Sequence, residues 1–144
     1  MSKVPPMMMP YGNPCYFIHY ITLIYLPIPR FHFDSLAYDN SARSVEIERT
    51  FEIPNDRGDD TPHAIVLKGV QLVHKFNSTA ADQVQIMMAL FRVESKAIDV
   101  VVTFNIPVVL VGEGTVGNED AATSEMDFDT FVRSFRIIDF GLFA

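Results

Sequence analysis

Cysteine is almost missing from this chain: Cys15 is the only one among 144 residues. A single cysteine cannot form a disulfide within the chain, and this usage is typical of proteins that fold in a reducing compartment. We therefore expect an intracellular protein. On that expectation the glycosylation sequon at residues 77–79 is a chance match, because such a site is used only in a secretory context.

Basic residues are also scarce. The chain has 11 Lys and Arg against 18 Asp and Glu, which gives a formal net charge of −7, and the basic residues are scattered without a basic run. Nucleic-acid binding needs clustered Lys and Arg to neutralise phosphates. The composition therefore argues against a nucleic-acid partner and leaves open a protein partner with a basic face.

The chain lacks an apolar run long enough to suggest a membrane-spanning helix. The apolar run at residues 16–28 is shorter than the roughly 20 residues that a spanning helix needs, and Pro27 and Pro29 interrupt its end. A signal peptide fits poorly, because Lys3 alone forms the basic region and no small-residue cleavage site follows. We interpret the run as a buried or poorly placed strand that follows a loose tail, and we expect no membrane partner.

A β-hairpin is the strongest pattern that is present. Residues 83–93 are apolar on both faces, which is typical of a central strand covered on both sides. Residues 98–106 alternate with a period of two, as a half-buried antiparallel strand does. A polar turn at residues 94–96 joins them, and Pro107 is expected to end the pairing because it has no N–H to donate.

Two more strands are predicted before the hairpin. Residues 45–53 alternate, with Arg49 as an exception near the strand's edge, and residues 64–76 form a long strand in which Gly69 indicates a bulge or bend. Residues 54–60 have the composition of a turn. Four consecutive strands with short polar connections predict an antiparallel meander. The inward side chains of the first strand are predicted to be Val45, Ile47, Phe51 and Ile53.

A helix is predicted after the hairpin. Residues 112–125 are polar and acidic, which indicates a surface loop, and Ser124 or Asp127 is expected to cap the helix that follows. Residues 135–143 are apolar again and predict a last strand or a packed tail. The fold class is therefore α+β, an antiparallel sheet meander with a helix packed on it. The helix's apolar stripe comprises Phe128, Phe131, Val132 and Phe135.

Several short motifs favour structural interpretations over functional ones. Residues 112–117 match G-x-G-x-x-G, but acidic residues follow and too little chain remains for a dinucleotide-binding unit, so we expect a loop. Residues 57–59 spell Arg-Gly-Asp, which we interpret as a turn. The four histidines lack the spacing of a zinc site. These histidines are His19, His32, His63 and His74.

No nucleophile or acid–base arrangement stands out along the chain. Glu46, Glu48 and Glu52 share one predicted strand face, which could be an acidic binding stripe but is more simply a solvated edge. We therefore assign no catalytic, cofactor-binding or metal-binding residue, and composition and spacing alone support only a soluble α+β domain.

Five segments, taken in order, resemble the Ran guanine-nucleotide release factor family, which has a PsbP-like fold. The segments are RFHFD at 30–34, VLKGVQ at 66–71 with Lys75 beyond it, ALFRV at 89–93, DVVVTFNIP at 99–107 and SFRIIDFGLF at 134–143. The resemblance implies a non-enzymatic, cofactor-free partner of the small GTPase Ran. Such a partner loosens the bound nucleotide and acts in nucleocytoplasmic transport, in the nucleus and cytoplasm.

Residues 1–29 depart from the family. Its members open with a Gly-Gly-containing strand and an acidic segment of the Asp-Asn-Gln-Glu-Val-Phe type that contacts Ran, and residues 1–29 contain no equivalent. We expect an atypical, replaced segment at 1–29, a release-factor-like domain at 30–144, and partner-binding residues that stay unknown. Two alternatives remain open: an interaction or structural module of the same fold without activity on the GTPase, and a nucleotide-binding enzyme.

Overall fold

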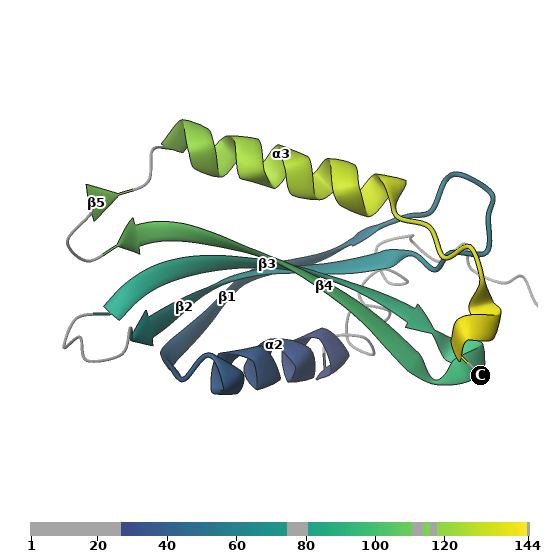
Figure 1. Ribbon diagram of the computed structural model, residues 1–144, viewed down its shortest axis with the longest axis horizontal. Helices are drawn as coiled ribbons and strands as arrows, with labels where there is room; N and C mark the ends of the chain where they lie inside the picture. Colours follow the sequence, from purple (N-terminus) through teal and green to yellow (C-terminus); the bar gives the residue numbers. More distant parts are fainter. Residues whose placement is uncertain (1–26, 75–80, 111–113, 116–117, 144) are drawn as a thin grey trace, which may run out of the picture.

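The computed structural model describes residues 27–74, 81–110, 114–115 and 118–143 of the chain. These residues form a five-stranded sheet in the order β1-β2-β3-β4-β5, with α2 against one face and α3 against the other (Figure 1). Most of the run at 16–28, the sequon at 77–79 and Cys15 lie outside the described residues. The elements are α2 Pro27–Asp39, β1 Ala42–Ile53, β2 Ala64–His74, β3 Ala81–Val93, a 3₁₀ turn Glu94–Lys96, β4 Ile98–Leu110, β5 Gly114–Thr115, α3 Asn118–Ser134 and a second 3₁₀ turn Phe140–Phe143.

The antiparallel meander and the α+β class are confirmed. Each strand pairs with the next in antiparallel register, and β3 lies between β2 and β4. As predicted for a covered central strand, β3 buries both of its faces: Met87 and Phe91 pack in the core under α3, and Ile86 and Met88 pack under α2. The inward residues of β4, from Val100 to Ile106, also face the α3 core as predicted.

A β-bulge in β1 overturns the prediction that its apolar residues share one face. Ile47 pairs with Gly69, but Arg49 pairs with Lys68, so Glu48 is an extra residue on β1. One extra residue moves every following side chain to the opposite face. Ile47 therefore packs under α2, whereas Ile53 lies in the core under α3. Gly69, where the sequence indicated a bulge, keeps regular pairing with β3 and lies opposite the bulge.

Pro107 does not end β4, contrary to the prediction. The strand continues to Leu110, and Pro107 pairs with Val84 beside a register shift between β3 and β4, after which Val109 pairs with Gln83. Proline is tolerated at bulges and on edge strands, where a missing N–H breaks no ladder. Both conditions hold here: Pro107 lies beside the register shift, and among the described residues β5 pairs only with Val109 and Leu110 of β4.

The predicted start of α3 was also wrong. The helix begins at Asn118, so Ser124 and Asp127 lie inside it and most of the predicted loop at 112–125 is helical. The Ser124 hydroxyl donates to the carbonyl of Asp120, one turn earlier, as serine does within a helix. The apolar stripe is confirmed at Phe128 and Val132, which are buried against the sheet.

The apolar C-terminal residues form no last strand. Residues 135–139 have no regular structure and lead into the 3₁₀ turn Phe140–Phe143. Phe135 packs on Phe91 with ring centroids 4.5 Å apart, so the tail is anchored at its beginning. Further along, Ile138 and Leu142 are 94% and 80% exposed.

Helix α2 was not predicted from the sequence. It starts at Pro27, so the division we predicted between residues 29 and 30 falls inside a helix. Its inner face carries Pro29, Phe33 and Ala37, all buried, and Phe33 lies against Gly69 of β2. None of the described helices is long and apolar enough to span a bilayer.

Candidate functional site

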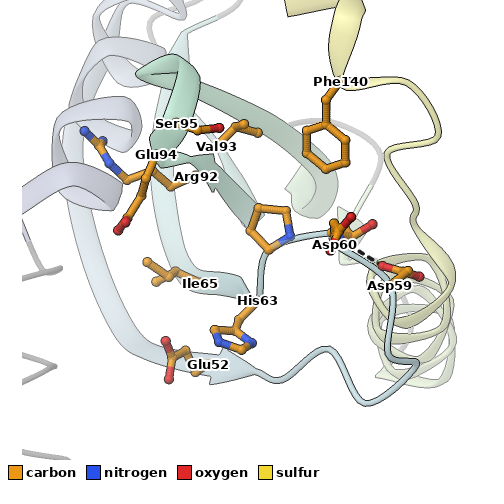
Figure 2. Close-up of a pocket in the computed structure, with 12 residues that line it drawn as sticks. Glu52, Asp59, Asp60, His63, Ile65, Arg92, Val93, Glu94, Ser95 and Phe140 are labelled. Atoms are coloured by element: carbon orange, nitrogen blue, oxygen red, sulfur yellow. Dashed lines mark hydrogen bonds between the residues drawn. The ribbon is translucent and has the colours of Figure 1, made fainter.

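A bowl of about 740 Å³ opens at the end of the sheet where β1 ends and β4 begins (Figure 2). Three segments far apart in the sequence meet there: the β1–β2 loop, the β3–β4 turn and the C-terminal 3₁₀ turn. Figure 2 shows Phe140 reaching from the C-terminal segment toward the loop that carries Asp60. The apolar lining includes Ile65, Val93 and Phe140, and the polar lining includes Glu52, Asp60, His63, Arg92 and Glu94.

The β1–β2 loop is held rigid by its own side chains. The Asn55 amide donates to the backbone carbonyl of Asp59 at 2.9 Å and to that of Thr61 at 2.8 Å. The Asp59 carboxylate accepts the Thr61 backbone N–H at 2.9 Å. Asn, Asp and Thr favour turns because they form such local bonds. The loop therefore presents one fixed wall to the bowl.

Arg57 ties this loop to the end of α3. Its guanidinium donates to the backbone carbonyls of Arg133 and Phe135, where the helix has carbonyls without an internal partner. Its Nε lies 3.1 Å from the Asp59 carboxylate. The Arg-Gly-Asp triplet is thus a turn, as predicted, and its two charges bind each other and the helix end.

The same bonds lower the pKa of the Asp59 carboxyl well below its usual range. Hydrogen bonds from the Thr61 hydroxyl and backbone N–H are the main cause, and Arg57 and Asn55 add to them. These donors stabilise the ionised form. Because the pKa is depressed by folding, the contribution of Asp59 to stability is complete above the unfolded value of about 4 and is lost as the pH falls toward the native value.

Replacing Asp59 with asparagine should therefore flatten the acid side of the stability profile. We expect the urea midpoint of the wild type to fall more steeply than that of Asp59→Asn between about pH 5 and pH 2. Asp60→Asn is the matched control, since it removes the neighbouring charge without touching the Thr61 bonds. Parallel profiles for the wild type and Asp59→Asn would contradict the assignment.

On the other side of the bowl, Arg92 belongs to a three-residue network. Its Nη1 lies 3.0 Å from one oxygen of Asp99, and His32 Nε2 of α2 lies 3.0 Å from the other. Asp99 thus compensates the Arg92 charge and joins α2 to the β3–β4 hairpin. The contact with Asp99 gives His32 a structural role, in agreement with our interpretation of the histidines.

Two carboxylates of the bowl have no cation beside them. Asp59 is compensated by Arg57 and Arg136, whereas Glu52 and Asp60 form no ion pair with any residue in the described ranges. Both side chains are exposed. A carboxylate rim over apolar surface suits the side chain of lysine or arginine, whose stem is apolar and whose head is charged. The geometry fits the binding of a basic protein surface.

The structure separates the three glutamates of the predicted acidic stripe. Glu46 pairs with Val70 and faces α3, Glu52 pairs with Ile65 and faces α2, and Glu48 lies at the bulge beside Lys68, 3.6 Å away. A one-residue bulge, which the alternating pattern does not reveal, is the reason. The stripe is therefore not a site.

Those residues of the remaining sequence motifs that the structure describes build no site either. In the G-x-G-x-x-G motif at 112–117, Gly114 and Thr115 pair with β4 in the antiparallel sheet. The other four residues of the motif lie outside the described ranges. His63 accepts a bond from the Asn55 backbone, and His19 is not among the described residues. Within the described ranges, no three His, Cys, Asp or Glu side chains are grouped as metal ligands.

Sequence comparisons relate the chain to known proteins. The profile of a family described as "Ran-interacting Mog1 protein" matches residues 27–107, from the start of α2 to Pro107. The "Ran guanine nucleotide release factor" of Danio rerio is 31% identical over 123 residues, which cover 80% of this chain and 67% of that protein. The "Probable ran guanine nucleotide release factor" of Dictyostelium discoideum is 36% identical over 87 residues, which cover 55% and 45%.

No solved structure is significantly similar to this chain. The alignments span about two thirds of the first relative and less than half of the second. The family profile covers more than half of the chain and includes α2 and all of β1, β2 and β3. The family resemblance found in the segments from residue 30 onward is thus confirmed, and the chain belongs to the family of Ran-interacting Mog1 proteins.

Proposed function

We propose that this protein binds the small GTPase Ran and accelerates the release of its bound guanine nucleotide. The observation that carries the proposal is the family match over residues 27–107, together with relatives named as Ran release factors. We further propose that it serves nucleocytoplasmic transport and is present in both nucleus and cytoplasm. The single cysteine and the family resemblance support that placement.

Release of a nucleotide by a binding partner requires no chemistry. If the protein binds the nucleotide-free GTPase more tightly than the loaded form, linkage requires that it weaken nucleotide binding by the same factor. A difference of about 2.8 kcal/mol weakens the nucleotide about a hundredfold. No covalent bond is broken, so the proposed function needs neither a nucleophile nor a general base, and we propose that the protein is not an enzyme.

The bowl is the surface that we propose for contact with the GTPase. Its walls are rigid, because Asn55 and Arg57 hold one side and Asp99 holds the other. Its uncompensated carboxylates, Glu52 and Asp60, attract a basic partner surface. Complementary charge at an interface mainly raises the association rate and weakens with salt.

Nucleotide exchange on Ran provides the test. The full chain is mixed with Ran loaded with fluorescent GTP, and separately with fluorescent GDP, in excess unlabelled nucleotide, and the loss of fluorescence is followed. We expect faster release than from Ran alone. Asp60→Lys should lower the effect about tenfold at low salt, equivalent to about 1.4 kcal/mol, whereas Asp127→Lys, the same charge change on α3, should not.

Each outcome has a separate meaning. A Ran complex without faster release supports the alternative of an interaction module with the same fold. The absence of both complex and release refutes the proposed function. Equal loss in Asp60→Lys and Asp127→Lys refutes the bowl as the contact while leaving Ran binding intact.

A further inference from the structure

Among the described residues, no strand lies along the outer edge of the second half of β1. Within the described residues β1 pairs only with β2, so the backbone groups of Arg49 to Ile53 that point away from β2 have no strand beside them. The bulge at Glu48 separates this stretch from the first half of the strand. An exposed strand edge is a template for another extended chain.

Beside this edge lies an apolar trough of about 440 Å³ between β1 and α3. Its floor is formed by Ile53, Met87 and Phe128, which are 4%, 3% and 1% exposed. The rim carries Phe51 and Met126, which are 36% and 71% exposed. The trough therefore opens directly onto the core.

The bulge and the position of α3 together create the trough. After Glu48, the side chains of Arg49, Phe51 and Ile53 face the α3 side. Helix α3, however, packs mainly on β3 and β4, away from the sheet edge that β1 forms (Figure 1). Of these side chains, Ile53 is buried under the helix, whereas Phe51 remains 36% exposed.

The charged side chains near this edge indicate which kind of strand can pair with it. Glu52 faces the other side of the sheet, toward α2, and has no cation beside it among the described residues. On the trough side, the Arg49 guanidinium lies 5.0 Å from the Phe51 ring and 3.9 Å from the Glu125 carboxylate, so its charge is already balanced. The edge therefore favours an incoming strand that is apolar on the trough side and basic on the other.

We propose that residues 49–53 of β1 receive an extended segment of a partner protein as an additional strand. Strand addition of this kind gains affinity from main-chain hydrogen bonds and specificity from pockets for alternate side chains. Apolar side chains enter the trough beside Phe51 and Ile53, and a lysine or arginine lies opposite Glu52. Opposite charges directly across a strand pair are favourable. The bulge limits the added strand to a short segment and disfavours edge pairing between two copies of the chain.

This surface shares Glu52 with the proposed Ran contact, but the trough itself has no lining residue in common with the bowl. Met126, its most exposed apolar side chain, lies on α3 and does not line the bowl. The Met126→Glu variant should therefore accelerate nucleotide release from Ran as the wild type does. Failure of the strand-addition proposal and failure of the Ran proposal are thus distinguishable.

Binding of a synthetic peptide to the full chain tests the proposal. The probe is a labelled, end-capped pentapeptide, Val-Lys-Val-Lys-Val, and its binding is followed by fluorescence anisotropy. We expect saturable binding that weakens at least about tenfold for Val-Glu-Val-Glu-Val and for a peptide N-methylated along one hydrogen-bonding edge. Two peptides, one methylated along each edge, are compared, because only one edge of an added strand bonds to β1.

Three protein variants extend the test. Met126→Glu places a charge at the trough and should weaken the lysine peptide about tenfold, whereas Leu142→Glu, the same kind of change at an exposed apolar residue elsewhere, should leave binding unchanged. Glu52→Lys should reverse the preference between the lysine and glutamate peptides. Equal binding of both peptides, or equal binding of both methylated forms, would overturn the proposal. Absence of peptide binding would also overturn the proposal. This holds whether residues 1–26 or a second copy of the chain covers the edge, and sedimentation detects the second copy as a dimer.

Discussion

Replacing Phe33 with alanine should lower the free energy of unfolding by about 3–5 kcal/mol, the cost of removing a fully buried aromatic side chain. Phe33 is 0% exposed and is the largest side chain of the cluster between α2 and the sheet. Its loss leaves a cavity over the centre of the sheet and removes the main contact that holds α2. The measurement is urea unfolding followed by circular dichroism.

Phe31→Ala is the matched control for this experiment. Phe31 is on the same helix but is 66% exposed, so its truncation should change stability by less than about 0.5 kcal/mol. Similar losses for the two variants would show that α2 is not held to the sheet through Phe33. That result would contradict the described packing of this helix.

Gly69→Ala should destabilise the protein by about 1–3 kcal/mol, as overpacking of a filled core does. A Cβ at this position would lie 2.5 Å from the backbone oxygen of Glu46 and 2.7 Å from Cζ of Phe33. The first neighbour is backbone and the second is a buried ring, so neither can move easily. Thermal or urea unfolding measures the loss.

Gly141→Ala controls for the loss of backbone freedom that any such change brings. A Cβ on Gly141 would meet only the flexible carboxylate of Asp139, at 2.9 Å, so we expect a change below about 0.5 kcal/mol. A double-mutant cycle with Phe33→Leu adds a second check. Gly69→Ala should cost less in the leucine background, because the ring atom is gone while the Glu46 oxygen remains. Additive effects would show that Phe33 is not the obstacle.

The sheet was predictable because its signals are local. The period of two in residues 98–106 and the two apolar faces of residues 83–93 follow from side-chain alternation along a strand, and both were confirmed. The same local signals place a polar turn at residues 94–96, where the structure has a 3₁₀ turn. Family membership was recognisable for a related reason, since three of the five matching segments lie in strands β2, β3 and β4.

Helix α3 shows how a local signal can mislead. Ser124 can cap a helix or bond back to the carbonyl four residues earlier, and in the structure it does the latter. The acidic residues Glu119 and Asp120 in the first turn, which favour a helix N-terminus, pointed to the earlier start. We assigned them to a loop because residues 112–125 are polar, acidic and Gly-containing, which is typical of a surface loop.

The bowl could not be predicted from the sequence. Its parts come from the β1–β2 loop, the β3–β4 turn and Phe140, and only folding brings them together. Arg57 shows this most clearly. Nothing near it in sequence indicates that its guanidinium binds the backbone carbonyls of Arg133 and Phe135.

Patterning along the chain was sufficient to specify four antiparallel strands, a helix with an apolar stripe and a family of GTPase partners, because alternation, turn chemistry and shared segments act over a few neighbouring residues. Contacts between residues distant in sequence decided which face of the sheet each side chain is on. The extra residue at Glu48 places Phe51 on the α3 face of the sheet. The Phe33 ring of α2 packs against Gly69 on the other face. Which face a strand shows is decided by contacts with elements distant in sequence, so the bowl and the trough exist only in the folded chain.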